Sequence, residues 1–118
     1  MAQNIKFPES KWIYNWGLDK SNANNLYSFI LEKKPEIIIE TGTFEAQATY
    51  VMAKAANENN NNCYIYTIDY NGDPTSNLDI SQWILLEKLK NENLKQIKNE
   101  FKNVKVIFCE GDSRDILK

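Results

Sequence analysis

Three short strand-like runs, separated by long helical patterns, are the feature that most constrains the fold. The first is Ile37-Ile38-Ile39, set between two glutamates, and its length and β-branching favour a strand buried on both faces. The second covers residues 64–69 and the third 104–110. Strands that are joined by helices pair in parallel through right-handed crossovers. The order therefore predicts a Rossmann-like parallel α/β sheet of about three strands, the N-terminal half of a doubly wound fold.

Helical patterns fill the intervals between these runs. They predict helices over residues 21–34, 44–57 and 80–101, and the opening of a fourth at 111–113. Pro35 stops the first of them, and Asp79 with Gln82 has the spacing of a capping box before the third. The lysine-rich stretch 87–102 interleaves glutamates with its lysines, which is typical of a solvated helix face.

The length of 118 residues allows one domain. We divide the chain into an aromatic-rich leader, residues 1–20, and the α/β domain, residues 21–118. In the leader we expect Trp12, Tyr14 and Trp16 to pack on the first helix rather than to form a lid over a substrate.

Composition excludes several classes of function. A net charge of −2 gives no basic excess, so we expect no nucleic-acid partner. No apolar run approaches the ~20 residues that span a bilayer, and no signal peptide is visible, so we expect a cytoplasmic protein without a membrane partner. The chain has no histidine, which removes histidine-based triads and histidine-ligated metals.

The two cysteines form no CxxC motif, so we expect neither a metal site nor a dithiol redox site. Cys63 begins its strand and Cys109 ends the neighbouring one. At ~3.3 Å per residue the two would lie ~20 Å apart, which is too far for a disulfide. Both are therefore expected to be reduced.

The three strand ends carry the candidate site, because doubly wound sheets bind ligands beyond the carboxyl ends of their strands. The segments that follow the strands are Glu40-Thr41-Gly42-Thr43-Phe44, Asp69-Tyr70 and Glu110-Gly111-Asp112-Ser113. A carboxylate after the second strand can accept both hydroxyls of a ribose. A carboxylate after the third can accept from an exocyclic amine. Together they predict a pocket for an adenosine group.

The first of these loops is not built for a pyrophosphate. A dinucleotide site needs G-x-G-x-x-G, whereas this loop contains only Gly42, and Glu45 would repel a phosphate. The expected ligand is therefore an adenosine with a cationic or zwitterionic tail, and Glu40 suits it by neutralising a positive centre. A nucleotide-dependent dehydrogenase is the weaker alternative.

The same three segments resemble the class I S-adenosylmethionine-dependent methyltransferases, most closely the small-molecule O-methyltransferase and cephalosporin-hydroxylase-like branch. The resemblance covers roughly residues 22–118. It implies S-adenosylmethionine as cofactor and methyl transfer to a small-molecule acceptor at oxygen. It also implies that Glu40, Gly42, Thr43 and Phe44 line the methionine part, that Asp69 holds the ribose, and that Asp112 with Ser113 holds the adenine. The full cofactor-binding set that we predict is Glu40, Thr41, Gly42, Thr43, Phe44, Asp69, Tyr70, Gly111, Asp112 and Ser113.

The chain departs from this family in two ways. The family usually has glycine where this chain has Ala46, although alanine fits a helix start better than glycine, by ~1 kcal/mol, if the backbone there is helical. The family also has a fourth strand and further ones, which supply the catalytic base or metal ligands, so we assign no catalytic residue and no metal.

Without those strands the first strand becomes an exposed apolar edge. We favour a piece of a larger enzyme. The alternatives are a homodimer, or a partner chain that covers this edge, and with them a non-catalytic module that binds an adenosine ligand.

Overall fold

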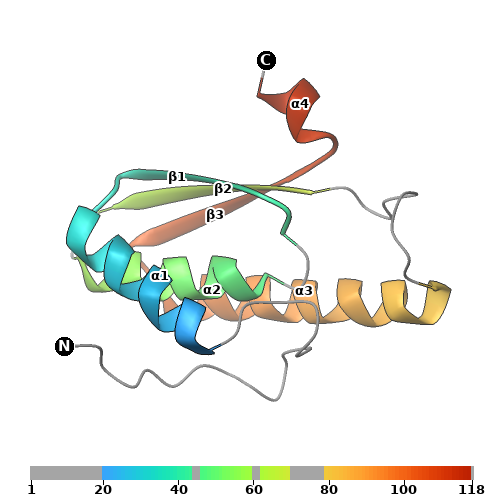
Figure 1. Cartoon of the computed structure of the whole chain (residues 1–118), viewed down its shortest axis with the longest axis horizontal. Coiled ribbons are helices and arrows are strands. Elements are labelled where there is room, and N and C mark those ends of the chain that lie inside the picture. The colour runs from blue at the N-terminus through green and yellow to red at the C-terminus, as the bar shows by residue number, and fades with distance from the viewer. Residues whose placement is uncertain (1–19, 44–45, 60–61, 70–78, 118) are drawn as a thin grey trace.

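The computed structural model describes residues 20–43, 46–59, 62–69 and 79–117 (Figure 1). Helices and strands alternate along the chain in the predicted order. They are α1 (Lys20–Lys33), β1 (Ile37–Thr41), α2 (Gln47–Glu58), β2 (Cys63–Asp69), α3 (Ile80–Glu100), β3 (Val104–Glu110) and α4 (Ser113–Ile116). The leader, with Trp12, Tyr14 and Trp16, lies outside the described residues, so its predicted packing stays a prediction.

The three strands form one parallel sheet in the order β1-β2-β3. Ile37 of β1 pairs with Tyr64 of β2, and Asp69 at the end of β2 pairs with Glu110 at the end of β3. Parallel strands joined by helices make this an open Rossmann-like α/β sheet, which confirms the predicted fold class.

Helices α1, α2 and α3 lie together on one side of the sheet (Figure 1). The core fills the space between them and the strands, with Ile65 of β2, Val51 of α2 and Ile97 of α3 almost fully buried. Small residues make this contact close, because Ala53, Ala55 and Ala56 bring α2 against its neighbours with no exposed surface. Both cysteines are free thiols, as expected from their positions at opposite strand ends.

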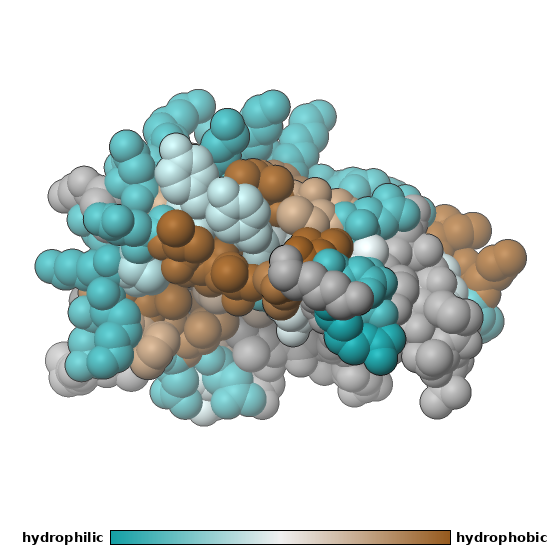
Figure 2. Space-filling view, turned by 90° about the horizontal axis from the view of Figure 1, so that it is seen from above, coloured by the Kyte–Doolittle hydropathy of each residue, from teal (hydrophilic) through white to brown (hydrophobic). Residues whose placement is uncertain are grey.

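The opposite face of the sheet is open over its amino-terminal half. Ile37 and Ile39 are 61% and 57% exposed, and their partners Tyr64 and Tyr66 are also exposed. Figure 2 looks onto this side and shows apolar residues gathered there. The prediction that the first strand is buried on both faces is therefore wrong. The reason is that β1 is an edge strand with α1 to α3 all on its other side, so only alternate residues of the run turn toward the core.

Helix α2 begins later than predicted, and the residue before it has an unusual conformation. Ala46 has φ 64° and ψ 28°, in the left-handed region, while its amide donates to the Thr43 carbonyl at 2.8 Å. An L-residue in this region costs about 1–2 kcal/mol, a cost that glycine avoids. The condition under which alanine would be better than glycine, a helical backbone at this residue, is therefore not met, and glycine would suit the observed conformation better.

Helix α3 begins as predicted and departs from prediction in its middle. Asp79 accepts a hydrogen bond from the backbone of Gln82 at 2.9 Å, and the Gln82 side chain accepts from the Asp79 backbone, which completes the capping box. Lys90, however, is only 8% exposed, so the lysine-rich stretch is not a uniformly solvated face. None of the helices in the described ranges has both the length and the apolar character that a bilayer crossing needs.

Candidate functional site

The three strand ends meet at one edge of the sheet. The amide of Gly42, after β1, donates to the Ile68 carbonyl of β2 at 2.8 Å. The amide of Gly111, after β3, donates to the Asp69 carbonyl at 2.8 Å. These bonds extend the ladder beyond the strands and bring together the loops that the sequence singled out. Both glycines have positive φ, 83° for Gly42 and 144° for Gly111, so a side chain at either would be strained.

Glu40 is the centre of a hydrogen-bond network that links β1, α2 and β2. Its Oε1 accepts from the Thr67 hydroxyl at 2.7 Å and from the Thr49 hydroxyl. The Thr67 and Thr43 hydroxyl oxygens lie 2.6 Å apart. Since Thr67 gives its single proton to Glu40, Thr43 must donate to Thr67. The hydrogen bonds from Thr49 and Thr67 both end on Oε1 of Glu40. Within the described residues Oε2 of Glu40 accepts no hydrogen bond, so this oxygen can accept from a ligand.

The sequence reasoning missed Thr49 and Thr67. Both are fully buried, although threonine is usually exposed. Thr67 lies in an otherwise apolar strand, and Thr49 lies in an alanine-rich helix. A buried hydroxyl needs a partner, so this pattern was the available signal, but it did not identify the partner.

Burial raises the pKa of Glu40 above its ordinary value. The two threonine hydroxyls oppose this rise in pKa by stabilising the charged form, and the nearby carboxylate of Asp69 adds to it. Ionisation of Glu40 therefore costs more free energy in the folded chain than in the unfolded chain. Its contribution to stability is full below the ordinary value of 4.5 and is lost as the pH rises through the folded pKa.

We expect Glu40→Gln to remove this pH dependence. The glutamine amide keeps an oxygen that accepts from Thr49 and Thr67 but cannot ionise. The difference in unfolding free energy between variant and native chain should shift in favour of the variant as the pH rises from 4 to 8. Urea denaturation of both chains across this range measures it. A difference that stays constant with pH would contradict the raised pKa.

Asp69 lies at the end of the central strand, half-buried, where its charge acts on Glu40. Two carboxylates from neighbouring strands therefore converge at this edge. Glu40 accepts hydrogen bonds from two hydroxyls of the protein. The strand partner of Asp69 is Glu110, which is exposed.

The Asp112 carboxylate, just before α4, accepts hydrogen bonds from a residue of that helix. It accepts from the Arg114 backbone amide at 2.8 Å and from the Arg114 guanidinium through Nε at 3.0 Å and Nη2 at 2.6 Å. This arrangement caps α4, so a ligand amine would have to share the carboxylate with Arg114. Phe44 and Tyr70 lie outside the described residues, as does the Ser113 side chain.

The polar groups at this edge of the sheet are carboxylate and hydroxyl oxygens, which can accept hydrogen bonds. Such groups accept from ribose hydroxyls, from an ammonium and from an exocyclic amine, which are the hydrogen-bond donors of S-adenosylmethionine. The cofactor that the resemblance implied therefore fits the residues present. Within the described residues no group of three histidine, cysteine, aspartate or glutamate side chains is arranged to hold a metal ion.

The comparisons with known proteins add one structural likeness. No protein-family model matches the sequence, and no curated protein matches it. Among solved structures, the chain is similar to the SAH-bound methyltransferase PaMTH1 of Podospora anserina, with a TM-score of 0.61 and 16% sequence identity. The alignment covers 95% of this chain and 39% of that one, so the chain spans well under half the length of its neighbour. The likeness supports the Rossmann-like fold of this chain.

Proposed function

We propose that this chain is the cofactor-binding part of an S-adenosylmethionine-dependent methyltransferase. The observation that carries the proposal is the convergence of Glu40 and Asp69 at the carboxyl ends of β1 and β2, with Glu40 Oε2 accepting no hydrogen bond from the described residues. The fold likeness to an SAH-bound methyltransferase supports the same assignment.

The roles of the site residues follow from their places around this edge. Asp69, beyond the central strand, accepts from the two ribose hydroxyls. Glu40 Oε2 accepts from the ammonium of the methionine part, and Gly42 lets that part approach the backbone. Asp112, together with Ser113, accepts from the adenine amine while Arg114 remains its partner. These residues bind and orient the cofactor.

Bound S-adenosylmethionine supplies a methyl group on a sulfonium. The strand-end residues would hold the cofactor so that this methyl group could be aligned with an acceptor oxygen of a small molecule, and such alignment is the chain's own contribution to the transfer. We assign no base for the acceptor among the described residues at the strand ends. The resemblance to small-molecule O-methyltransferases is what supports an oxygen acceptor.

Calorimetric titration with S-adenosylhomocysteine tests the proposal. We expect saturable binding to the folded chain with a dissociation constant in the micromolar range. ATP and NADH are the controls, because Glu45 in the first loop and the absence of a G-x-G-x-x-G motif disfavour a phosphate. Tighter binding of either phosphate ligand would overturn the methyltransferase assignment, and tighter binding of NADH would favour a nucleotide-dependent dehydrogenase.

A second candidate is a non-catalytic module that binds an adenosine ligand and shares its sheet with another copy or chain. The exposed Ile37, Ile39, Tyr64 and Tyr66 favour it, since parallel sheets are normally covered on both faces. Sedimentation velocity over a range of concentrations tests it. Self-association that Ile39→Lys abolishes would support the homodimer, and a monomer at every concentration would contradict it.

A further inference from the structure

A second hollow lies at the other edge of the sheet, between α3 and β3. It has a volume of about 430 Å³, within the range of small-molecule sites, about 300–1,000 Å³. Its lining residues are Leu94, Lys95, Ile97, Lys98, Val104, Lys105, Val106 and Phe108. None of them belongs to the predicted cofactor set, so this groove is separate from the site at the strand ends.

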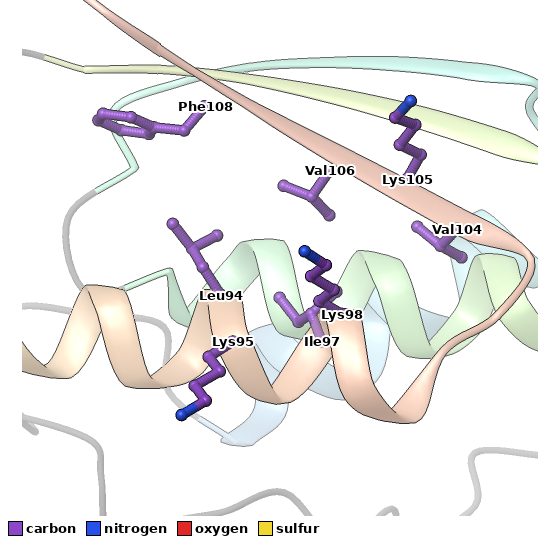
Figure 3. Close-up of a pocket in the computed structure, with 8 residues that line it drawn as sticks. All are labelled: Leu94, Lys95, Ile97, Lys98, Val104, Lys105, Val106 and Phe108. Carbon is purple, nitrogen blue, oxygen red and sulfur yellow. The ribbon is translucent and has the colours of Figure 1, made fainter.

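The groove has an apolar floor. Val104, Val106 and Phe108 alternate along β3 and turn toward α3, where Leu94 and Ile97 face them (Figure 3). Such a surface favours an aliphatic or aromatic group, which gains by leaving water.

Every charged side chain in the lining is a lysine, and the three lysines are directed differently. Lys98 extends from α3 toward β3 (Figure 3). Lys95 points away from the groove, and Lys105 leaves β3 on the opposite side of the strand (Figure 3). Lys98 is therefore the lining lysine that can meet a ligand in the groove.

A further lysine lies beside the lining and is buried. Lys90 is 8% exposed, and its Nζ lies 4.4 Å from the centroid of the Phe108 ring. Within the described residues no carboxylate lies within ion-pair distance of Lys90 or of Lys98. A buried ammonium whose partner is the face of an aromatic ring is incompletely compensated, and an anion nearby would stabilise it.

We propose that the groove between α3 and β3 binds a small amphipathic anion. Its alkyl chain lies on the apolar floor, and its carboxylate or phosphate head pairs with Lys98, within the field of Lys90. The complementary charge commits the site to an anion, because its lining includes no acidic side chain. This inference does not depend on the proposed methyltransferase function.

Titration of the isotopically labelled chain with decanoate, followed by amide chemical shifts, tests the proposal. We expect saturable shifts in residues of α3 and β3, and weaker binding, by at least about tenfold, of decanol and of decyltrimethylammonium. Decyl phosphate is compared with decanoate. Tighter binding of one head assigns the natural ligand to that chemical class, and either result supports the site.

Lys98→Glu is the decisive variant, and Lys95→Glu is its matched control. Lys95 and Lys98 are both exposed and lie three residues apart on α3, so the two variants change the net charge equally. We expect Lys98→Glu to weaken decanoate binding by at least about tenfold and Lys95→Glu by less than about twofold. Equal losses in the two variants, or decanol binding as tightly as decanoate, would overturn the proposal.

Discussion

Ile65→Ala is expected to lower the free energy of unfolding by about 2–5 kcal/mol. Ile65 lies in the middle of the central strand β2 and has no exposed surface. It belongs to the core cluster that joins α2, α3 and the sheet, so its truncation leaves a cavity with packed walls on every side. Domains of this size have stabilities of about 5–15 kcal/mol, so this loss is a large share of the total. Urea denaturation followed by circular dichroism measures it.

Tyr64→Ala is the matched control, because Tyr64 is the preceding residue on the same strand and points to the open face. It is 45% exposed, so its truncation removes less buried surface. We expect a loss of about 1 kcal/mol or less. Equal losses at Ile65 and Tyr64 would show that the open face is covered in solution, which would contradict the one-sided core.

Asp69→Ala is expected to weaken binding of S-adenosylhomocysteine by about 100-fold. If the carboxylate accepts from both ribose hydroxyls, its removal loses two hydrogen bonds to a charged group, and a loss of about 2.8 kcal/mol corresponds to that factor. The side chain lies at a strand end outside the core cluster, so we expect the variant to remain folded. Calorimetric titration of variant and native chain gives the ratio of dissociation constants.

Glu36→Ala is the control for Asp69→Ala. Glu36 carries a carboxylate next to a strand, as Asp69 does, but it is exposed and precedes β1, at the end of the sheet away from the site. We expect its dissociation constant to stay within about twofold of the native value. If the native chain and Asp69→Ala bind S-adenosylhomocysteine equally well, Asp69 does not contact the ligand, and other residues must bind it.

The elements themselves were predictable from local sequence. β-branched runs of strand length, the capping box at Asp79 and the stop at Pro35 depend on neighbours within a few residues, and the structure has strands and helices where these signals predict them. The parallel order followed because helical connections leave few other topologies. The grouping of Glu40, Asp69 and Asp112 at one edge followed from the same topology.

What only the tertiary structure decided depends on contacts between residues far apart in the chain. The apolar run Ile37–Ile39 is compatible both with a strand covered on its two faces and with a strand covered on one. Ile37 and Ile39 are exposed because all three long helices pack on the other side of the sheet. Glu40 meets Thr67 because β1 pairs with β2, and it meets Thr49 because α2 packs on the sheet. Lys90 is buried where α3 lies against Phe108. Short-range signals determine which elements form. Burial, pKa and ligand access depend on the packing of distant elements, which sequence periodicity does not encode.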